Sequence, residues 1–285
     1  MIDAKVVASS VLAIIVILSL SAYFGLLLSG VDLTYIGFPF SSENSVESAV
    51  MNSFVFLALV LLGTLIMFLI IRSRRTPMLP LVMAGAVLFS FWGILEVFLE
   101  LVVPVPPSMY PVCEVLAIGV SVLTAILIIK PFSIFLLDLL LVLYGSMAGS
   151  LFYAILPPWS VISVAVVLAV YDLYSVFRGP LRRILESTVS ETEGQQRIPG
   201  SLRGGVIYIG GLALGMGDVL IYSMLSPLYL LYPTPSPLRW ILGTFSLMVG
   251  FLLTLRMLKK RRFMPALPLP VLLSLFAYIL ALKAF

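Results

Sequence analysis

Long apolar stretches are the feature that most limits what this chain can fold into. Nine of them approach 20 residues, the length that an α-helix needs to cross the hydrocarbon core of a bilayer. They are Val6–Leu28, Val50–Ile71, Met78–Val103, Val112–Ile129, Phe132–Tyr153, Trp159–Phe177, Val206–Leu231, Leu238–Leu258 and Met264–Lys283. Charged residues make up only 11% of the chain, against about 25% in soluble domains. The sequence therefore predicts an all-α polytopic membrane protein, with one nine-span domain over residues 1–285.

Lysine and arginine are distributed unevenly between the predicted loops. Of the 17 such residues, all except Arg239 and Lys283 fall on one side of the predicted membrane. Positively charged loops remain on the cytoplasmic side. We therefore expect a cytoplasmic N-terminus, an outer C-terminus and a cytoplasmic loop over residues 178–205, in the cell membrane if the source is prokaryotic. This asymmetry accounts for the net charge of +4 without a nucleic-acid partner.

Two residue types that build many catalytic and metal sites are scarce. The chain has no histidine and a single cysteine, Cys113. An intramolecular disulfide and a Cys/His zinc site are therefore excluded. Catalysis by a serine–histidine or cysteine–histidine pair is excluded as well.

Several acidic residues fall within the apolar stretches or at their edges, where an ionisable group is costly and often functional. They are Glu96, Glu100, Glu114, Asp138, Asp172 and Asp218. Glu100 and Glu114 lie near outer ends, where they are expected to reach water. Glu96 and Asp138 lie deeper, and hydrogen bonds to neighbouring groups would account for them, although a functional role stays open. Asp172 and Asp218 have more unusual surroundings.

The depth of these last two acids decides whether they can meet. Asp172 lies six residues before Arg178, so about 9 Å of helix separates it from the cytoplasmic edge. If the seventh span were helical from Val206, Asp218 would lie about 22 Å deep. The two carboxyls would then be too far apart to interact.

Glycine argues against a helix over the first part of this seventh span. It occupies six of the fourteen positions 204–217, and each glycine disfavours helix by up to about 1 kcal/mol relative to alanine. We therefore predict that the helix begins near Gly215 or Gly217 and that residues 206–214 are extended or looped. Such backbone is tolerated at membrane depth only beside protein or a water-filled cavity. This start would place Asp218 in the first helical turn, within reach of Asp172.

Two carboxyls a few ångströms apart cannot both ionise easily, so the pair is expected to share a proton. The ionised member can act as general base to a water, while the protonated member polarises a carbonyl. Asp218, at the positive end of its helix, is the predicted base. Asp172, in mid-helix among apolar neighbours, is the predicted acid.

The sequences around these acids resemble those of a known family. Tyr171-Asp172 and Gly215-Met216-Gly217-Asp218 resemble the YD and GxGD signatures of the intramembrane aspartyl proteases, which comprise the presenilins and the signal peptide peptidases. A third signature of that family resembles Pro265-Ala266-Leu267, at the start of the ninth span. The three occur in the family's order, on the sixth, seventh and ninth of nine spans.

This resemblance implies cleavage of single-span membrane proteins or remnant signal peptides within the bilayer, with Asp172 and Asp218 as the catalytic pair. Further active-site residues implied in the same way are Tyr171, Gly215, Gly217, Pro265, Ala266 and Leu267. No metal or organic cofactor is implied, because water and two acids suffice. The topology and short loops suggest a prokaryotic, archaeal presenilin homologue that acts without a partner, and a homo-oligomer is compatible with them. Met216 occupies the position where the family usually has leucine. The resemblance therefore does not imply which substrate side chains are preferred near this residue.

A β-branched and aromatic segment precedes the glycine-rich turn, and it consists of Val206, Ile207, Tyr208 and Ile209. A substrate helix must unwind before cleavage, and its freed backbone groups need new partners inside the membrane. The segment could supply them by adding the substrate as a strand. The alternative is an ordinary lipid-facing helix start.

Two other functions fit part of the pattern. A prepilin-type peptidase also uses a membrane GxGD aspartate, but that family does not show the Pro-Ala-Leu motif or this nine-span layout. A proton-coupled transporter or cation channel could use the acid pair as a relay or gate. The sequence shows no internal repeat of the kind that many transporters have.

Overall fold

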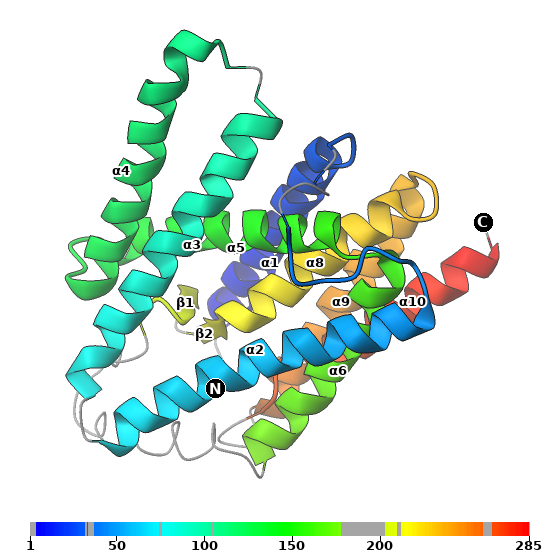
Figure 1. Cartoon of the computed structure of the whole chain (residues 1–285). Helices are drawn as coiled ribbons and strands as arrows, with labels where there is room; N and C mark the ends of the chain where they lie inside the picture. Colours follow the sequence, from blue (N-terminus) through cyan, green and yellow to red (C-terminus); the bar gives the residue numbers. More distant parts are fainter. Residues whose placement is uncertain are drawn as a thin grey trace.

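The structure is a computed structural model that describes residues 4–31, 33, 37–73, 76–103, 105–177, 203–209, 212–258 and 264–284. Over these residues the chain forms nine α-helices and a β-hairpin (Figure 1). The helices are α1 (Ala4–Leu28), α2 (Val46–Arg72), α3 (Leu79–Leu101), α4 (Tyr110–Ile129), α5 (Ile134–Ile155), α6 (Pro158–Phe177), α8 (Met216–Leu231), α9 (Pro237–Leu258) and α10 (Pro268–Ala284). The strands are β1 (Val206–Ile209) and β2 (Leu212–Gly215), and two 3₁₀ turns are η2 (Thr76–Met78) and η3 (Pro107–Met109). Most of the predicted cytoplasmic loop over residues 178–205 lies outside the described residues.

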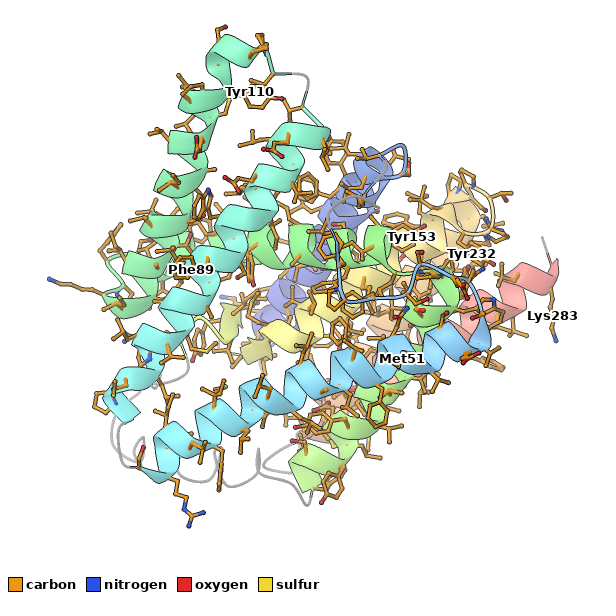
Figure 2. All side chains as sticks on the ribbon, in the orientation of Figure 1. Met51, Phe89, Tyr110, Tyr153, Tyr232 and Lys283 are labelled. Carbon is orange, nitrogen blue, oxygen red and sulfur yellow. The ribbon has the colours of Figure 1, made fainter. Side chains whose placement is uncertain are left out.

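The outer surface of the helices is apolar. Within the described ranges, seven helices are long and apolar enough to cross a membrane, and α8 and α10 are shorter apolar helices. Met51 of α2 and Phe89 of α3, labelled in Figure 2, have 61% and 69% of their surface exposed. An apolar surface this extensive needs lipid rather than water around it. The prediction of an all-α polytopic membrane protein is confirmed.

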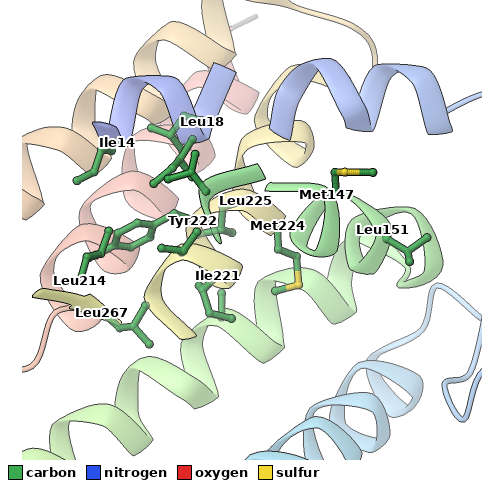
Figure 3. Close-up of a cluster of buried hydrophobic side chains, with 14 of the residues drawn as sticks. Ile14, Leu18, Met147, Leu151, Leu214, Ile221, Tyr222, Met224, Leu225 and Leu267 are labelled. Carbon is green, nitrogen blue, oxygen red and sulfur yellow. The ribbon is translucent and has the colours of Figure 1, made fainter. Parts of the chain in front are cut away.

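Helix α8 lies at the centre of the bundle and packs against α1, α5, α6 and α9. Every residue from Ile221 to Tyr229 is buried. Helix α5 comes close because Gly149 has no side chain: a Cβ there would lie 2.3 Å from the Cβ of Ser223. Small residues permit such close packing where lipid removes the hydrophobic driving force between helices. Leu18 of α1 and Met147 of α5 complete the apolar layer around α8 (Figure 3).

Hydrogen bonds between side chains join α2 to α6. The amide nitrogen of Asn52 donates to Ser160 Oγ at 2.9 Å, and the Ser53 hydroxyl donates to Ser163 Oγ at 2.7 Å. Polar pairs of this kind hold membrane helices together where apolar contacts discriminate little between helix and lipid. They fix α2 along α6, the helix that carries Asp172.

A β-hairpin precedes α8 where a continuous seventh span would have placed helix. Strands β1 and β2 are antiparallel, with Val206 opposite Gly215 and Ile209 opposite Leu212. The hairpin contacts α1 and α5 through β1 and α8 through β2, so protein rather than lipid surrounds much of it. The predicted extended segment before the seventh helix is confirmed. The alternative of a helix start at residues 206–209 is wrong, because this segment pairs as a strand.

The last helix begins later than the predicted span Met264–Lys283. Helix α10 starts at Pro268, and Met264 to Leu267 are not helical. Proline disfavours helix in the residue before it and is well tolerated in the first helical turn. Pro265 and Pro268 therefore hold Ala266 and Leu267 in a loop whose backbone N–H groups are free to bind elsewhere.

Candidate active site

Asp218 occupies the third position of α8, and Gly215 is the N-cap residue with extended backbone. A carboxyl at this position reaches back to the N–H of the N-cap residue and lies at the positive end of the helix dipole. The Asp218 carboxyl accordingly interacts with the backbone N–H of Gly215. A Cβ on Gly215 would lie only 3.0 Å from Asp218 Oδ2, so glycine leaves the room that this carboxyl occupies.

Asp172 lies near the end of α6, five residues before Phe177, rather than in mid-helix as predicted. Its Oδ2 accepts a hydrogen bond from the backbone N–H of Leu267 at 3.1 Å, and the N–H of Ala266 also faces this carboxyl. Both donors belong to the loop that the prolines keep out of α10. The predicted Pro-Ala-Leu motif therefore lies directly against Asp172.

Helices α6 and α8 pack together and bring the two carboxyls within direct electrostatic interaction. Both side chains are partly buried. In surroundings of low dielectric, two negative charges this close repel strongly, so a single shared proton stabilises the pair. Each carboxyl interacts with a backbone donor, so these contacts favour neither the predicted base, Asp218, nor the predicted acid, Asp172.

Tyr222 adds a contact that the sequence analysis missed. It lies four residues after Asp218, on the same face of α8, and its side chain is fully buried. Its hydroxyl donates to the carbonyl oxygen of Ala266 at 2.8 Å. The only sequence signal was a tyrosine one helical turn after the aspartate, and nothing local pointed to a partner 44 residues away.

Asp138 of α5 binds the hairpin. The backbone N–H of Tyr208 donates to Asp138 Oδ1 at 3.0 Å. Hydrogen-bonded and non-hydrogen-bonded pairs alternate along an antiparallel ladder. Since the N–H of Tyr208 is directed at α5, it points away from β2. Asp138 thus satisfies a backbone donor at the outer edge of β1.

Comparison with known proteins shows similarity to one family. No family model matches the chain. Presenilin-B of Dictyostelium discoideum is 31% identical over 136 residues, which are 44% of this chain and 26% of that protein. Presenilin-A of the same organism is 25% identical over 182 residues, which are 59% of this chain and 27% of that protein. The chain therefore spans about a quarter of the length of the curated relatives it matches.

The fold is also that of solved structures. A presenilin family intramembrane aspartate protease in space group C222 has a TM-score of 0.63 and 18% identity, over 96% of this chain and 99% of its own. A structure with the same description in space group P2 has a TM-score of 0.61 and 20% identity, over 95% and 97%. The chain is a presenilin homologue.

In this presenilin homologue Tyr171 and Gly217 directly precede Asp172 and Asp218 in the sequence. The Tyr171 hydroxyl donates to Thr64 Oγ1 of α2 at 3.4 Å, which joins α2 and α6. Gly217 is exposed, and a Cβ there would have no atom within 4 Å. Open space therefore remains at the residue before Asp218.

The other membrane acids of the homologue lie on α3 and α4. Glu100 and Glu114 are exposed near the ends of their helices, and Glu96 is partly buried. Helices α3 and α4 pack chiefly against each other and project from the rest of the bundle in Figure 1. Among the residues that the structure describes, no cluster of three or more His, Cys, Asp or Glu could hold a metal ion.

A small cavity adjoins the Pro-Ala-Leu loop of the homologue. Its volume is about 80 Å³, and its wall includes Ala266, Leu214 of β2, and Phe251 and Thr254 of α9. The wall is mostly apolar. This site can accommodate a small apolar group between the hairpin and α9.

Proposed function

We propose that this presenilin homologue is an intramembrane aspartic endopeptidase of the GxGD type, with Asp172 and Asp218 as its catalytic dyad. The observation that carries the proposal is the meeting of two carboxyls from α6 and α8, inside an apolar bundle and with a backbone donor for each. Similarity in sequence to presenilins, and in fold to presenilin family intramembrane aspartate proteases, supports it.

The proposed chemistry uses one water and one shared proton. The ionised carboxyl takes a proton from the water, whose oxygen attacks the carbonyl carbon of the scissile peptide. The protonated carboxyl donates to the carbonyl oxygen as the tetrahedral intermediate forms. The C–N bond then breaks: the departing nitrogen takes a proton from one carboxyl, and a hydroxyl of the intermediate returns its proton to the other carboxyl as the new carboxylic acid forms. The charge of the pair is the same before and after the cycle, and no step needs a metal or cofactor.

The proposed substrate is a single membrane-spanning helix or a remnant signal peptide. Its backbone must leave the helix before cleavage, and strand pairing would satisfy the freed groups. The N–H of Tyr208, at the outer edge of β1, is already bound by Asp138. Ala213 lies opposite Tyr208, and two residues that face each other in an antiparallel pair direct their N–H groups either both inward or both outward. The N–H of Ala213 therefore points outward from β2. We therefore place the substrate strand on β2 rather than on the predicted segment Val206–Ile209, which pairs with the other edge of β2.

An apolar substrate side chain would enter the small cavity beside Ala266. The cavity lies between β2 and α9, next to the loop that binds Asp172. A substrate strand on β2 would direct alternate side chains to opposite faces, one of them toward this wall. Recognition would then depend on backbone pairing and on apolar bulk, which suits transmembrane sequences.

Cleavage of a labelled single-span substrate by the purified chain in liposomes tests the proposal. Wild type is expected to cleave without a partner protein. Asp172→Asn and Asp218→Asn are each expected to abolish cleavage, because an amide can neither accept the proton of the water nor share a proton with its neighbour. Thermal unfolding of each variant in detergent serves as the control for folding.

Two outcomes would contradict the proposal. Cleavage that persists in a folded Asp172→Asn or Asp218→Asn variant would exclude the dyad. Absence of cleavage by folded wild type, across several apolar substrates and lipid mixtures, would exclude an autonomous protease.

A further inference from the structure

The peptide group between Ala266 and Leu267 is bonded at both of its ends. Its carbonyl oxygen, on Ala266, accepts the Tyr222 hydroxyl at 2.8 Å. Its N–H, on Leu267, donates to Asp172 Oδ2 at 3.1 Å. One peptide unit thus connects a side chain of the helix that carries Asp218 with the carboxyl of Asp172.

A peptide group is planar, so fixing its carbonyl also fixes the direction of its N–H. The bond from Tyr222 therefore directs the Leu267 N–H toward Asp172. Hydrogen bonds in a chain also polarise one another, so a donor on the carbonyl strengthens the N–H as a donor. Burial strengthens both hydrogen bonds and their mutual polarisation, because water does not compete for the same groups.

The surroundings of Tyr222 support this function for its hydroxyl. Its ring is fully buried in the same apolar cluster as Leu214 and Leu267. Figure 3 shows the ring pointing from α8 toward Leu214, with Leu267 below it. Pro265 and Pro268 flank the bonded peptide and carry no N–H of their own. The Tyr222 hydroxyl and Asp172 are the two side-chain partners that the structure gives this short loop.

We propose that Tyr222 is a positioning residue, which holds the Ala266–Leu267 peptide so that its N–H orients Asp172 toward Asp218. The inference rests on the proposed function for its catalytic consequence, although the hydrogen-bonded chain itself is a property of the resting molecule. Tyr222 takes no part in proton transfer to substrate. It acts through the peptide and sets the geometry of the dyad.

The test compares Tyr222→Phe with Tyr229→Phe. Tyr229 lies seven residues further along α8, is equally buried, and donates its hydroxyl to Ser274 Oγ of α10 at 2.7 Å. Both variants therefore lose one buried hydroxyl and one bond from α8 to the last segment of the chain. Only Tyr222→Phe removes the bond to the loop at Asp172.

Turnover is measured per folded enzyme. Tyr222→Phe is expected to lower kcat on the order of 10-fold with KM unchanged, since misplacing a reacting group slows chemistry without weakening substrate binding. Tyr229→Phe is expected to keep the wild-type kcat. Equal kcat values in the two variants would overturn the inference while leaving the protease assignment in place.

Hydrogen exchange gives a second readout that does not need activity. Between Pro265 and Pro268 only Ala266 and Leu267 carry backbone amides. Their exchange, followed by mass spectrometry in detergent, is expected to become faster in Tyr222→Phe and to remain unchanged in Tyr229→Phe. Unchanged protection in Tyr222→Phe would refute the inference even if wild type showed no cleavage, so its failure is distinguishable from failure of the proposed function.

Discussion

At the scale of single residues, the two glycines of the Gly215-Met216-Gly217-Asp218 turn differ in purpose. A Cβ on Gly215 would lie 3.0 Å from Asp218 Oδ2, whereas a Cβ on Gly217 would meet no atom within 4 Å. The first glycine is needed for the carboxyl itself. The second leaves open space at the surface of the site. Glycine is therefore present at these two positions for two different physical reasons.

Gly215→Ala is therefore expected to displace the Asp218 carboxyl and lower kcat on the order of 10-fold, with the fold retained. Gly217→Ala is expected to keep the carboxyl in place and to raise or preserve thermal stability, since alanine favours helix by up to about 1 kcal/mol. Cleavage rates and unfolding temperatures in detergent check both. Wild-type kcat in Gly215→Ala would contradict the crowding argument.

At the scale of elements, the hairpin depends on α5. The Asp138 carboxyl accepts the N–H of Tyr208, and without it that donor would face the bundle unpaired. An unsatisfied buried donor costs about 1–3 kcal/mol. Asp138→Leu is expected to loosen β1, lower thermal stability and reduce cleavage.

Asp138→Asn is the matched control for that variant. Its amide oxygen can still accept the N–H of Tyr208, so stability and cleavage near wild type are expected. Loss of cleavage in Asp138→Asn as complete as in Asp138→Leu would show that the charge of Asp138, not its acceptor oxygen, is required.

The outer edge of β2 gives a second element-scale prediction. Ala213 is exposed, and its N–H points away from β1, so proline there removes a donor that the hairpin does not use. Ala213→Pro is expected to preserve folding and to raise KM strongly, because a substrate strand loses a backbone partner. Ala213→Val, which keeps the N–H, is the control. Unchanged KM in a folded Ala213→Pro variant would rule out pairing on β2.

At the scale of the whole molecule, the charge asymmetry predicts which end of the bundle faces the cytoplasm. Cys113, a partly exposed residue near the start of α4, would then lie at the outer surface. A membrane-impermeant maleimide added to intact cells is expected to label this cysteine before lysis. Labelling only after permeabilisation would invert the proposed topology.

Ser73, which caps the far end of α2, provides the opposite control. A chain with Cys113→Ser and Ser73→Cys carries its single thiol on the predicted cytoplasmic side. It is expected to react only after the membrane is opened. Cys113→Ser alone should not react under either condition.

Much of the fold could be predicted because its signals are local. Span length, glycine density and proline position each act within a few residues, and they gave the helical membrane fold and the late start of α8 at Met216. The start of α10 was placed too early, because apolar composition continues through Met264 to Leu267 while Pro268 sets where the helix begins. Apolar composition therefore indicates which residues can lie in the membrane, whereas the position of proline decides where the helix begins.

The sequence alone determined the residue types of the candidate site, the order of its motifs and the solvent in which the chain folds. Packing decided what those residues touch. The bond from Tyr222 to Ala266 spans 44 residues, the bond from Leu267 to Asp172 spans 95, and the bond from Tyr208 to Asp138 spans 70. No local pattern encodes such pairs, because they arise only when α5, α6, α8 and the loop before α10 pack around one point. The acids could be read from the chain, but the groups that orient them belong to the tertiary structure.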